Sequence, residues 1–211
     1  MTEEFIFRFV PAKGLGAPPL LLLHGTGGDE NDLLQLGAMV SPNSALLSPR
    51  GRVLENGMPR FFRRLAEGVF DEEDVRRRAL ELADFAEQAR SRHGIDRPIA
   101  LGYSNGANIA AALMLLRPRA LAGAALLRAM VPLSKPPRPD LKGVPVLIAS
   151  GKVDPIVPAC NSARLAAMLQ DAGAKVSHEV LPVGHQLSGL DLALLRDWLT
   201  TLNVSEPLST G

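Results

Sequence analysis

The segment Pro98–Ala111, PIALGYSNGANIAA, decides how the rest of the sequence is interpreted. Its first six residues are apolar and bounded by proline, as expected for a strand that is buried on both faces. Ser104 follows directly and opens a helical pattern that runs to Leu116. Gly102 and Gly106 lie two positions before and after it, so the segment predicts a G-x-S-x-G turn between a strand and a helix. Such a turn lifts a serine hydroxyl above the edge of a parallel sheet.

Six other short apolar runs have the same character and are also predicted to be strands. They are Phe5–Val10, Leu20–Leu23, Ala45–Leu47, Leu121–Leu127, Val144–Ser150 and Lys175–Leu181. Helical patterns separate most of them: Asp29–Val40, the amphipathic stretch Val75–Ala89 with Asp71 as its N-terminal cap, Ser104–Leu116, Cys160–Ala172 and Leu187–Leu199. Because strands and helices alternate, we expect an α/β protein with a mainly parallel sheet of about seven strands and helices on both faces.

The length of 211 residues suits one large core. We expect a single domain over residues 1–204 and a flexible tail over residues 205–211. The predicted strands and helices account for most of the chain, so no insertion is long enough to form a separate cap domain. The content of 46% hydrophobic and 21% charged residues is typical of globular proteins.

Charge and hydropathy exclude several classes of partner. Twenty-three Lys and Arg against 22 Asp and Glu leave a net charge of +1, which gives no field for holding nucleic acid. No run reaches about 18 apolar residues, so stable membrane insertion is not expected. The acidic start MTEEF and the single cysteine, Cys160, indicate a cytoplasmic location, and we expect Cys160 to be buried by packing. The sequence leaves open whether the protein forms a homodimer.

A serine hydroxyl is a poor nucleophile near neutral pH, so Ser104 needs a base and a group that orients the base. Of the four histidines, His185 follows the last predicted strand in a loop, where it can reach the carboxyl edge of the sheet. Asp154 directly follows the Val144–Ser150 strand, which places it at the same edge. The chain order Ser104, Asp154, His185 is the order of α/β-hydrolases. We therefore expect a Ser-Asp-His triad in an α/β-hydrolase fold.

The glycine-rich loop His24–Gly28 follows the second predicted strand, where α/β-hydrolases donate an N–H group to the developing oxyanion. We assign this role to the backbone N–H groups of Thr26 and Asn105. A tight turn before the next helix is the simpler interpretation of the loop taken alone. The expected reaction requires no cofactor, and no metal site is predicted.

Five stretches together resemble the carboxylesterase/phospholipase family of α/β-hydrolases and are similar to acyl-protein thioesterases: LLLHGTGGDENDLL, RFFRRLAEGVFDEEDV, LGYSNGANIA, GKVDPIVP and GHQL. The resemblance implies a carboxylesterase that cleaves small esters, and thioesters as a further class, through an acyl-enzyme. It also implies Ser104 as nucleophile, His185 as base and Asp154 as the partner of the base. Asn105 stands where many thioesterase-like members carry glutamine.

Two irregular connections, Ser48–Phe70 and Val131–Pro139, are the available walls of a substrate cleft. We expect four apolar residues to line it, although each is equally compatible with the core: Met58, Phe61, Met130 and Leu187. An open cleft favours short to medium acyl chains. The alternative function is a non-catalytic small-molecule receptor on a hydrolase scaffold.

Three of the arginines in the first of these connections, Arg60, Arg63 and Arg64, stand beside Phe61 and Phe62. Their guanidinium forks suit an acidic group of the substrate. They can instead pair with Glu67 and the acidic residues 71–74, and so fasten the connection to the helix that follows. The short separation in sequence favours fastening.

Overall fold

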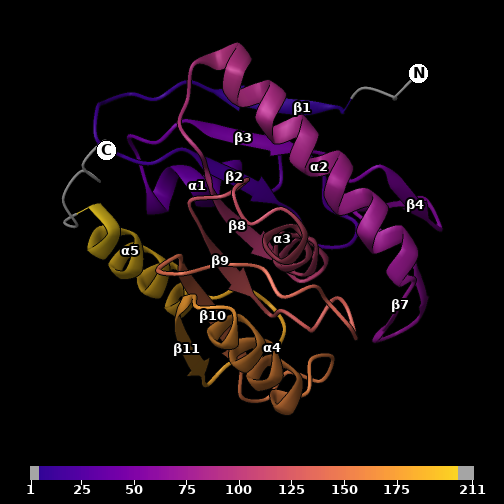
Figure 1. Ribbon diagram of the computed structural model, residues 1–211. Coiled ribbons are helices and arrows are strands. Elements are labelled where there is room, and N and C mark those ends of the chain that lie inside the picture. The colour runs from indigo at the N-terminus through magenta and orange to yellow at the C-terminus, as the bar shows by residue number, and fades with distance from the viewer. Residues whose placement is uncertain (1–4, 204–211) are drawn as a thin grey trace.

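The computed structural model describes residues 5–203, in which seven strands form one sheet with the order β1-β3-β2-β8-β9-β10-β11 (Figure 1). The strands are β1 (Phe7–Val10), β2 (Leu20–Leu23), β3 (Leu46–Pro49), β8 (Ile99–Tyr103), β9 (Gly123–Leu127), β10 (Pro145–Gly151) and β11 (Lys175–Leu181). Within the described part of this sheet, only β1 runs antiparallel to its neighbour. The mainly parallel sheet is therefore confirmed, whereas the tail predicted at 205–211 lies outside the described residues.

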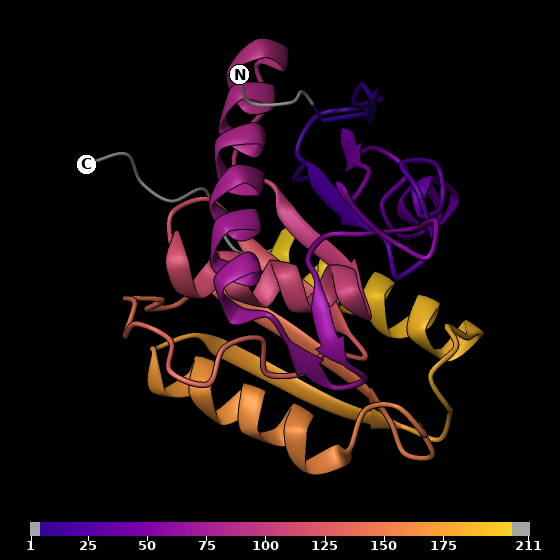
Figure 2. The same ribbon diagram turned by 90° about the vertical axis from the view of Figure 1, so that its right-hand side faces the viewer.

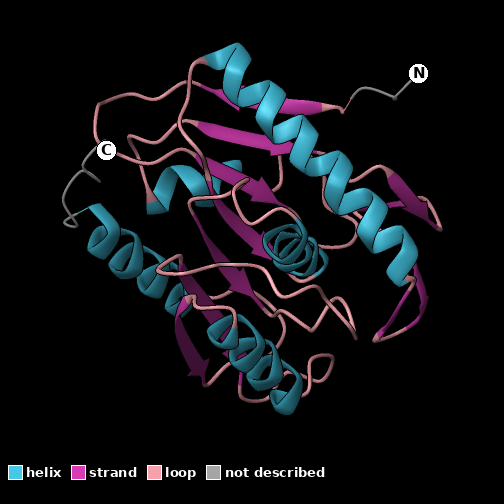
Figure 3. Ribbon diagram, viewed as in Figure 1, coloured by secondary structure: helices cyan, strands magenta, loops and turns pink. Residues whose placement is uncertain are grey.

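In the described part of the chain, five helices cover the sheet: α1 (Leu34–Val40), α2 (Glu72–His93), α3 (Asn105–Leu116), α4 (Ala159–Asp171) and α5 (Gly189–Asn203) (Figure 3). Successive strand residues point to opposite faces, which splits the core into two clusters. Leu21 and Leu23 pack with α2, α3 and α4, while Leu20 and Leu22 pack with α1 and α5. Figure 2 shows the long α2 helix passing α3 on its side of the sheet. Helices on both faces explain why the central strands are apolar throughout.

Two predictions need correction: the start of the first helix and the burial of Cys160. The first helix begins at Leu34 and not at Asp29, because the Asp29 carboxylate accepts a hydrogen bond from the Asn31 N–H (2.8 Å) and holds a turn instead. Cys160 is exposed and not buried, because the buried face of α4 is on the opposite side. Every helix within the described residues is too short or too polar to cross a membrane.

The connection between β3 and α2 is more ordered than its sequence suggests. Residues 51–70, called the hairpin segment below, form two antiparallel hairpins: β4 (Val53–Glu55) with β5 (Met58–Arg60), and β6 (Arg64–Ala66) with β7 (Val69–Phe70). Asn56 and Gly57 turn the first hairpin with positive φ angles of 51° and 80°. This Asn-Gly pair is a strong hairpin signal that an expectation of irregular structure overlooks.

Candidate active site

Ser104 lies on a strained turn between β8 and α3. Its φ and ψ angles of 52° and −113° lie outside the regions that non-glycine residues ordinarily adopt. A methyl group on Gly106 would collide with the backbone carbonyl of Leu23, so only glycine allows α3 to start so close to β2. The turn presents the Ser104 side chain to a cavity at the carboxyl edge of the sheet.

The structure brings Ser104, His185 and Asp154 together in one hydrogen-bonded chain. Nε2 of His185 is 3.0 Å from Oγ of Ser104, and Nδ1 of His185 is 2.8 Å from Oδ2 of Asp154. Asp154 comes from the turn after β10, and His185 from the loop between β11 and α5. Three segments that are distant in the sequence therefore supply one side chain each.

Asp154 is held in its ionised form. Burial acts to raise its pKa, but hydrogen bonds from the backbone N–H groups of Val157 and Ile156, together with His185, bring the pKa below its usual value. An ionised carboxylate only accepts hydrogen bonds, so Nδ1 of His185 carries the proton of that bond. Nε2 is then free to accept the proton of the Ser104 hydroxyl.

Arg128, at the end of β9, ties down the loop that carries His185, residues 183–188, called the histidine loop below. Its Nε donates to the carbonyl of Gly184 (2.9 Å) and its Nη2 to the carbonyl of Gln186 (3.2 Å), so both neighbours of His185 are held. A twin contact with the Asp191 carboxylate (2.8 and 2.9 Å) and a bond to the Ala149 carbonyl use its remaining N–H groups.

Arg128 and Asp191 are almost completely inaccessible to solvent. Sequence reasoning missed both residues. The available signal is a charged residue directly after the wholly apolar run of β9, since a buried arginine requires a partner. The partner, Asp191, is 63 positions away, and no residue near Arg128 in the sequence indicates it.

The loop after β2, which carries Thr26, is fixed by a neutral histidine. Nε2 of His24 accepts a hydrogen bond from the Gly51 N–H (2.9 Å), so its Nδ1 carries the proton and donates to the carbonyl of Gly25. Burial lowers the pKa of His24, which agrees with a neutral ring. Gly27 adds a backbone bond to Pro59 (3.0 Å). These contacts attach the loop to the hairpin segment.

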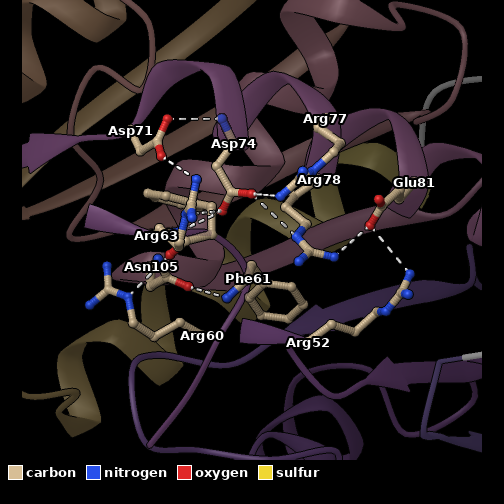
Figure 4. Close-up of polar contacts among 11 residues, drawn as sticks. Arg52, Arg60, Phe61, Arg63, Asp71, Asp74, Arg77, Arg78, Glu81 and Asn105 are labelled. Carbon is tan, nitrogen blue, oxygen red and sulfur yellow. Dashed lines mark hydrogen bonds and ion pairs between the residues drawn. The ribbon is translucent and has the colours of Figure 1, made fainter. Parts of the chain in front are cut away.

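Asn105, the residue after Ser104, also contacts the hairpin segment. Its Oδ1 accepts a hydrogen bond from the Phe61 N–H (2.7 Å), which fixes the orientation of the side-chain amide (Figure 4). Its Nδ2 is buried and has no hydrogen-bond partner among the described residues. Nitrogen and oxygen cannot be exchanged here, because the oxygen is needed opposite the Phe61 N–H.

A cavity of about 370 Å³ adjoins these groups. Thr26, Ser104, Asn105, Met130 and His185 are among the residues that line it, together with Arg60, Arg64, Glu67, Asn108 and Arg128. The other three residues expected in the pocket lie elsewhere. Phe61 is buried in the core on the α2 side, Leu187 packs on the α5 side, and Met58 is exposed on the first hairpin. The wall is thus more polar than expected, because the hairpins contribute Arg60 and Arg64 to it.

Arg60, Arg63 and Arg64 of the hairpin segment divide into two groups. Arg63 contacts Asp71 (2.7 Å) and Asp74, and thus fastens the segment to α2 as the sequence suggests (Figure 4). Arg60 and Arg64 instead pair with Glu55, which the first hairpin brings beside them. Neither contacts Glu67 or the acidic start of α2 in the described structure, so the fastening interpretation holds for Arg63 alone.

Comparisons with known proteins give a consistent result. The family described as Phospholipase/Carboxylesterase matches residues 9–203. The chain is 49% identical over 193 residues to the "Putative hydrolase MhqD" of Bacillus subtilis (strain 168), covering 90% of this chain and 96% of that protein. A carboxylesterase structure from Bacillus cereus is 44% identical with a TM-score of 0.92, covering 95% of each chain. One from Mesorhizobium loti is 35% identical with a TM-score of 0.86, covering 93% of this chain and 94% of that chain.

Proposed function

The chain belongs to the phospholipase/carboxylesterase family, and from this premise we propose that it is a serine hydrolase that cleaves small carboxylic esters through an acyl-enzyme. One observation carries the proposal: Ser104, His185 and Asp154 form a continuous hydrogen-bonded chain that ends at the cavity. A serine, a base within hydrogen-bond reach and a carboxylate behind the base are the parts that acyl transfer requires.

In the proposed reaction, Oγ of Ser104 attacks the ester carbonyl while Nε2 of His185 takes the hydroxyl proton. The Asp154 carboxylate holds the ring and stabilises the imidazolium that forms. The tetrahedral intermediate then expels the alcohol, which receives the proton from His185. Water, activated by the same histidine, attacks the acyl-enzyme, releases the acid and restores Ser104.

The negative charge that develops on the carbonyl oxygen needs donors that are already in place. We assign the backbone N–H groups of Thr26 and Asn105 to this role, since both residues line the cavity beside Ser104. The contacts of His24 and Gly27 with the hairpin segment support the assignment, because they fix the loop before substrate arrives. Preorganised donors cost no rearrangement during the reaction.

The proposed substrates have short to medium acyl chains. A cavity of about 370 Å³ is near the small end of ligand pockets, which run from about 300 to 1,000 Å³. Thioesters are a further proposed class, because they undergo the same attack at a carbonyl carbon.

A fluorophosphonate probe tests the proposal directly. We expect it to label the wild-type protein covalently and Ser104→Ala not at all, with mass spectrometry placing the adduct on Ser104. Ser44→Ala is the matched control, because Ser44 is a buried serine that bonds the Pro18 carbonyl away from the cavity. Equal labelling of wild type and Ser104→Ala contradicts the proposal, and so does tight ester binding without turnover.

A further inference from the structure

Two guanidinium groups on the cavity wall share a single carboxylate. Arg60 contacts Glu55 through Nη1 (3.0 Å), and Arg64 contacts the other oxygen of Glu55 through Nε (2.8 Å). Both arginines line the cavity together with Ser104, whereas Glu55 is not among the lining residues. The group of three residues therefore carries one positive charge more than it neutralises.

The environment of Arg60 shows the same imbalance. Burial lowers the pKa of Arg60, and among charged groups only Glu55 opposes that effect, whereas Arg64 adds to it. Glu67 also lines the cavity, but it is exposed to solvent and is not among the charges that act on Arg60. A charge near solvent is screened, so Glu67 does not replace a buried counterion.

The same wall keeps hydrogen-bond donors that the described residues do not use. Arg60 donates to the Phe62 carbonyl through Nε, and to the Thr26 hydroxyl and Glu55 through Nη1. Its Nη2 has no hydrogen-bond partner among residues 5–203. Arg64 uses only Nε, which leaves both of its Nη groups. Nδ2 of Asn105 is buried and equally unpartnered. A buried donor without a partner costs stability, so a ligand with acceptor oxygens would gain by meeting it.

We propose that Arg60, Arg64 and Asn105 form a subsite for a carboxylate carried by the substrate, so that the protein prefers monoanionic esters to neutral esters of the same shape. A carboxylate has two acceptor oxygens, matches the planar guanidinium fork and supplies the missing negative charge. It is also small enough to share the cavity with the ester group. The subsite lies next to the proposed oxyanion donors, since Arg60 bonds the side chain of Thr26 (2.9 Å). This inference rests on the proposed ester hydrolysis.

The test compares esters that differ only in charge. Monoethyl succinate against ethyl succinamate places the carboxylate or its neutral amide on the acyl side. The pair 4-acetoxybenzoate and 4-acetoxybenzamide places it on the leaving group. We expect kcat/KM to favour the anion by about tenfold or more in one of the two pairs, the effect of one charge-assisted hydrogen bond. The preference should fall as salt is added.

Substitutions then change the ratio of the two kcat/KM values in opposite directions. Arg64→Gln should lower the ratio of anion to amide, because it removes the surplus charge. Glu55→Gln should raise the ratio, because it leaves both guanidinium groups free for the substrate. Arg119→Gln is the matched control: it removes the same charge from an exposed position beyond the far end of α3, and the ratio should stay at its wild-type value.

A ratio near one for both ester pairs overturns the subsite, as does a ratio that neither Arg64→Gln nor Glu55→Gln changes. Binding separates this failure from a failure of the proposed function. Calorimetry with monoethyl succinate and Ser104→Ala protein needs no turnover, and adding Arg64→Gln to that protein should weaken binding about tenfold. Equal binding overturns the subsite even where esters are hydrolysed, whereas weakened binding supports it even where no ester is turned over.

Discussion

Arg128 and Arg60 line the same cavity and are both almost completely buried, but they differ in how their charge is accommodated. Arg128 has a carboxylate of its own and uses every N–H group on partners within the protein. Arg60 shares its carboxylate with Arg64 and leaves a donor unused. An arginine whose N–H groups are all hydrogen-bonded within the protein, such as Arg128, holds segments together. An arginine with an unused N–H group, such as Arg60, can still donate a hydrogen bond to a ligand. The histidine loop and the hairpin segment thus illustrate a structural and a binding use of the same residue type.

The largest effect is expected from a substitution of Asp154, the carboxylate that contacts His185 of the histidine loop. Asp154→Asn keeps an oxygen for the backbone N–H groups of Ile156 and Val157, so the fold should persist. It no longer fixes the His185 tautomer, and kcat should fall by about 10⁴-fold. Steady-state kinetics with a denaturation midpoint near the wild-type value would support this expectation. Near-normal turnover would show that another acid serves His185.

Substitution of Arg128 should lower both the free energy of unfolding and the rate of the reaction. Arg128→Met leaves Asp191 buried without a counterion, and removal of one partner from such a pair costs about 3–5 kcal/mol of unfolding free energy. Urea denaturation measures this loss. The double variant Arg128→Met with Asp191→Leu should recover much of the stability, but not the activity, because the carbonyls of Gly184 and Gln186 lose their tie. Recovery of both would contradict a positioning role for Arg128.

The hairpin segment is expected to respond less strongly. Gly57 has a φ of 80° with open space around the position of a Cβ atom, so Gly57→Ala changes backbone strain alone. We expect a loss of about 1–2 kcal/mol, and a lower kcat/KM for anionic esters if the turn places Arg60 and Glu55. Gly57→Asn is the matched control, since asparagine tolerates this conformation better than alanine. Equal behaviour of the two variants would argue against the turn as the cause.

The smallest effect concerns pH and the contact between His24 and Gly51. Burial lowers the pKa of His24 below its ordinary 6.5, so the unfolded chain takes up a proton at pH values where the folded protein does not. The free energy of unfolding should therefore be level above about pH 7.5 and fall as the pH is lowered through 6.5. Denaturation at pH 7.5 and 5.5 should show a smaller loss for His24→Gln than for the wild type.

His178 must be separated from His24 in that measurement. Burial lowers its pKa too, and its ring contacts the Ser150 hydroxyl (2.9 Å) on the opposite part of the sheet. His178→Gln should remove its own share of the pH dependence and leave that of His24 in place. A pH dependence that is unchanged in both variants would mean that neither histidine is the cause.

The sequence predicts the fold well because the signals are local. Apolar runs such as Leu20–Leu23 are buried on both faces, and the alternation with helices leaves few arrangements. The proximity of Ser104, Asp154 and His185 also follows, since each stands in the connection that follows a parallel strand. The Asn56-Gly57 turn was predictable as well, but the proline and glycine content around it suggested irregular structure.

Other features were not predicted. Nothing near Arg128 in the sequence indicates Asp191, which stands 63 positions away. The pairing of Glu55 with Arg60 and Arg64 is local, but it follows only once the first hairpin is recognised. The pocket prediction suffered similarly, since the apolar character of Phe61 suits a core and a pocket equally. Burial and cavity lining are decided by packing, which leaves no pattern of its own in a single sequence.

The exposed position of Cys160 has a practical consequence for any study of self-association. An accessible thiol can be oxidised to a disulfide with the same thiol of a second chain. Because Cys160 is the only cysteine in the 211 residues, disulfide formation can link two chains but cannot link a third. A dimer seen without a reducing agent would then report the chemistry of one sulfur atom, and only a dimer that survives reduction, or forms with Cys160→Ser, would reflect a folded interface.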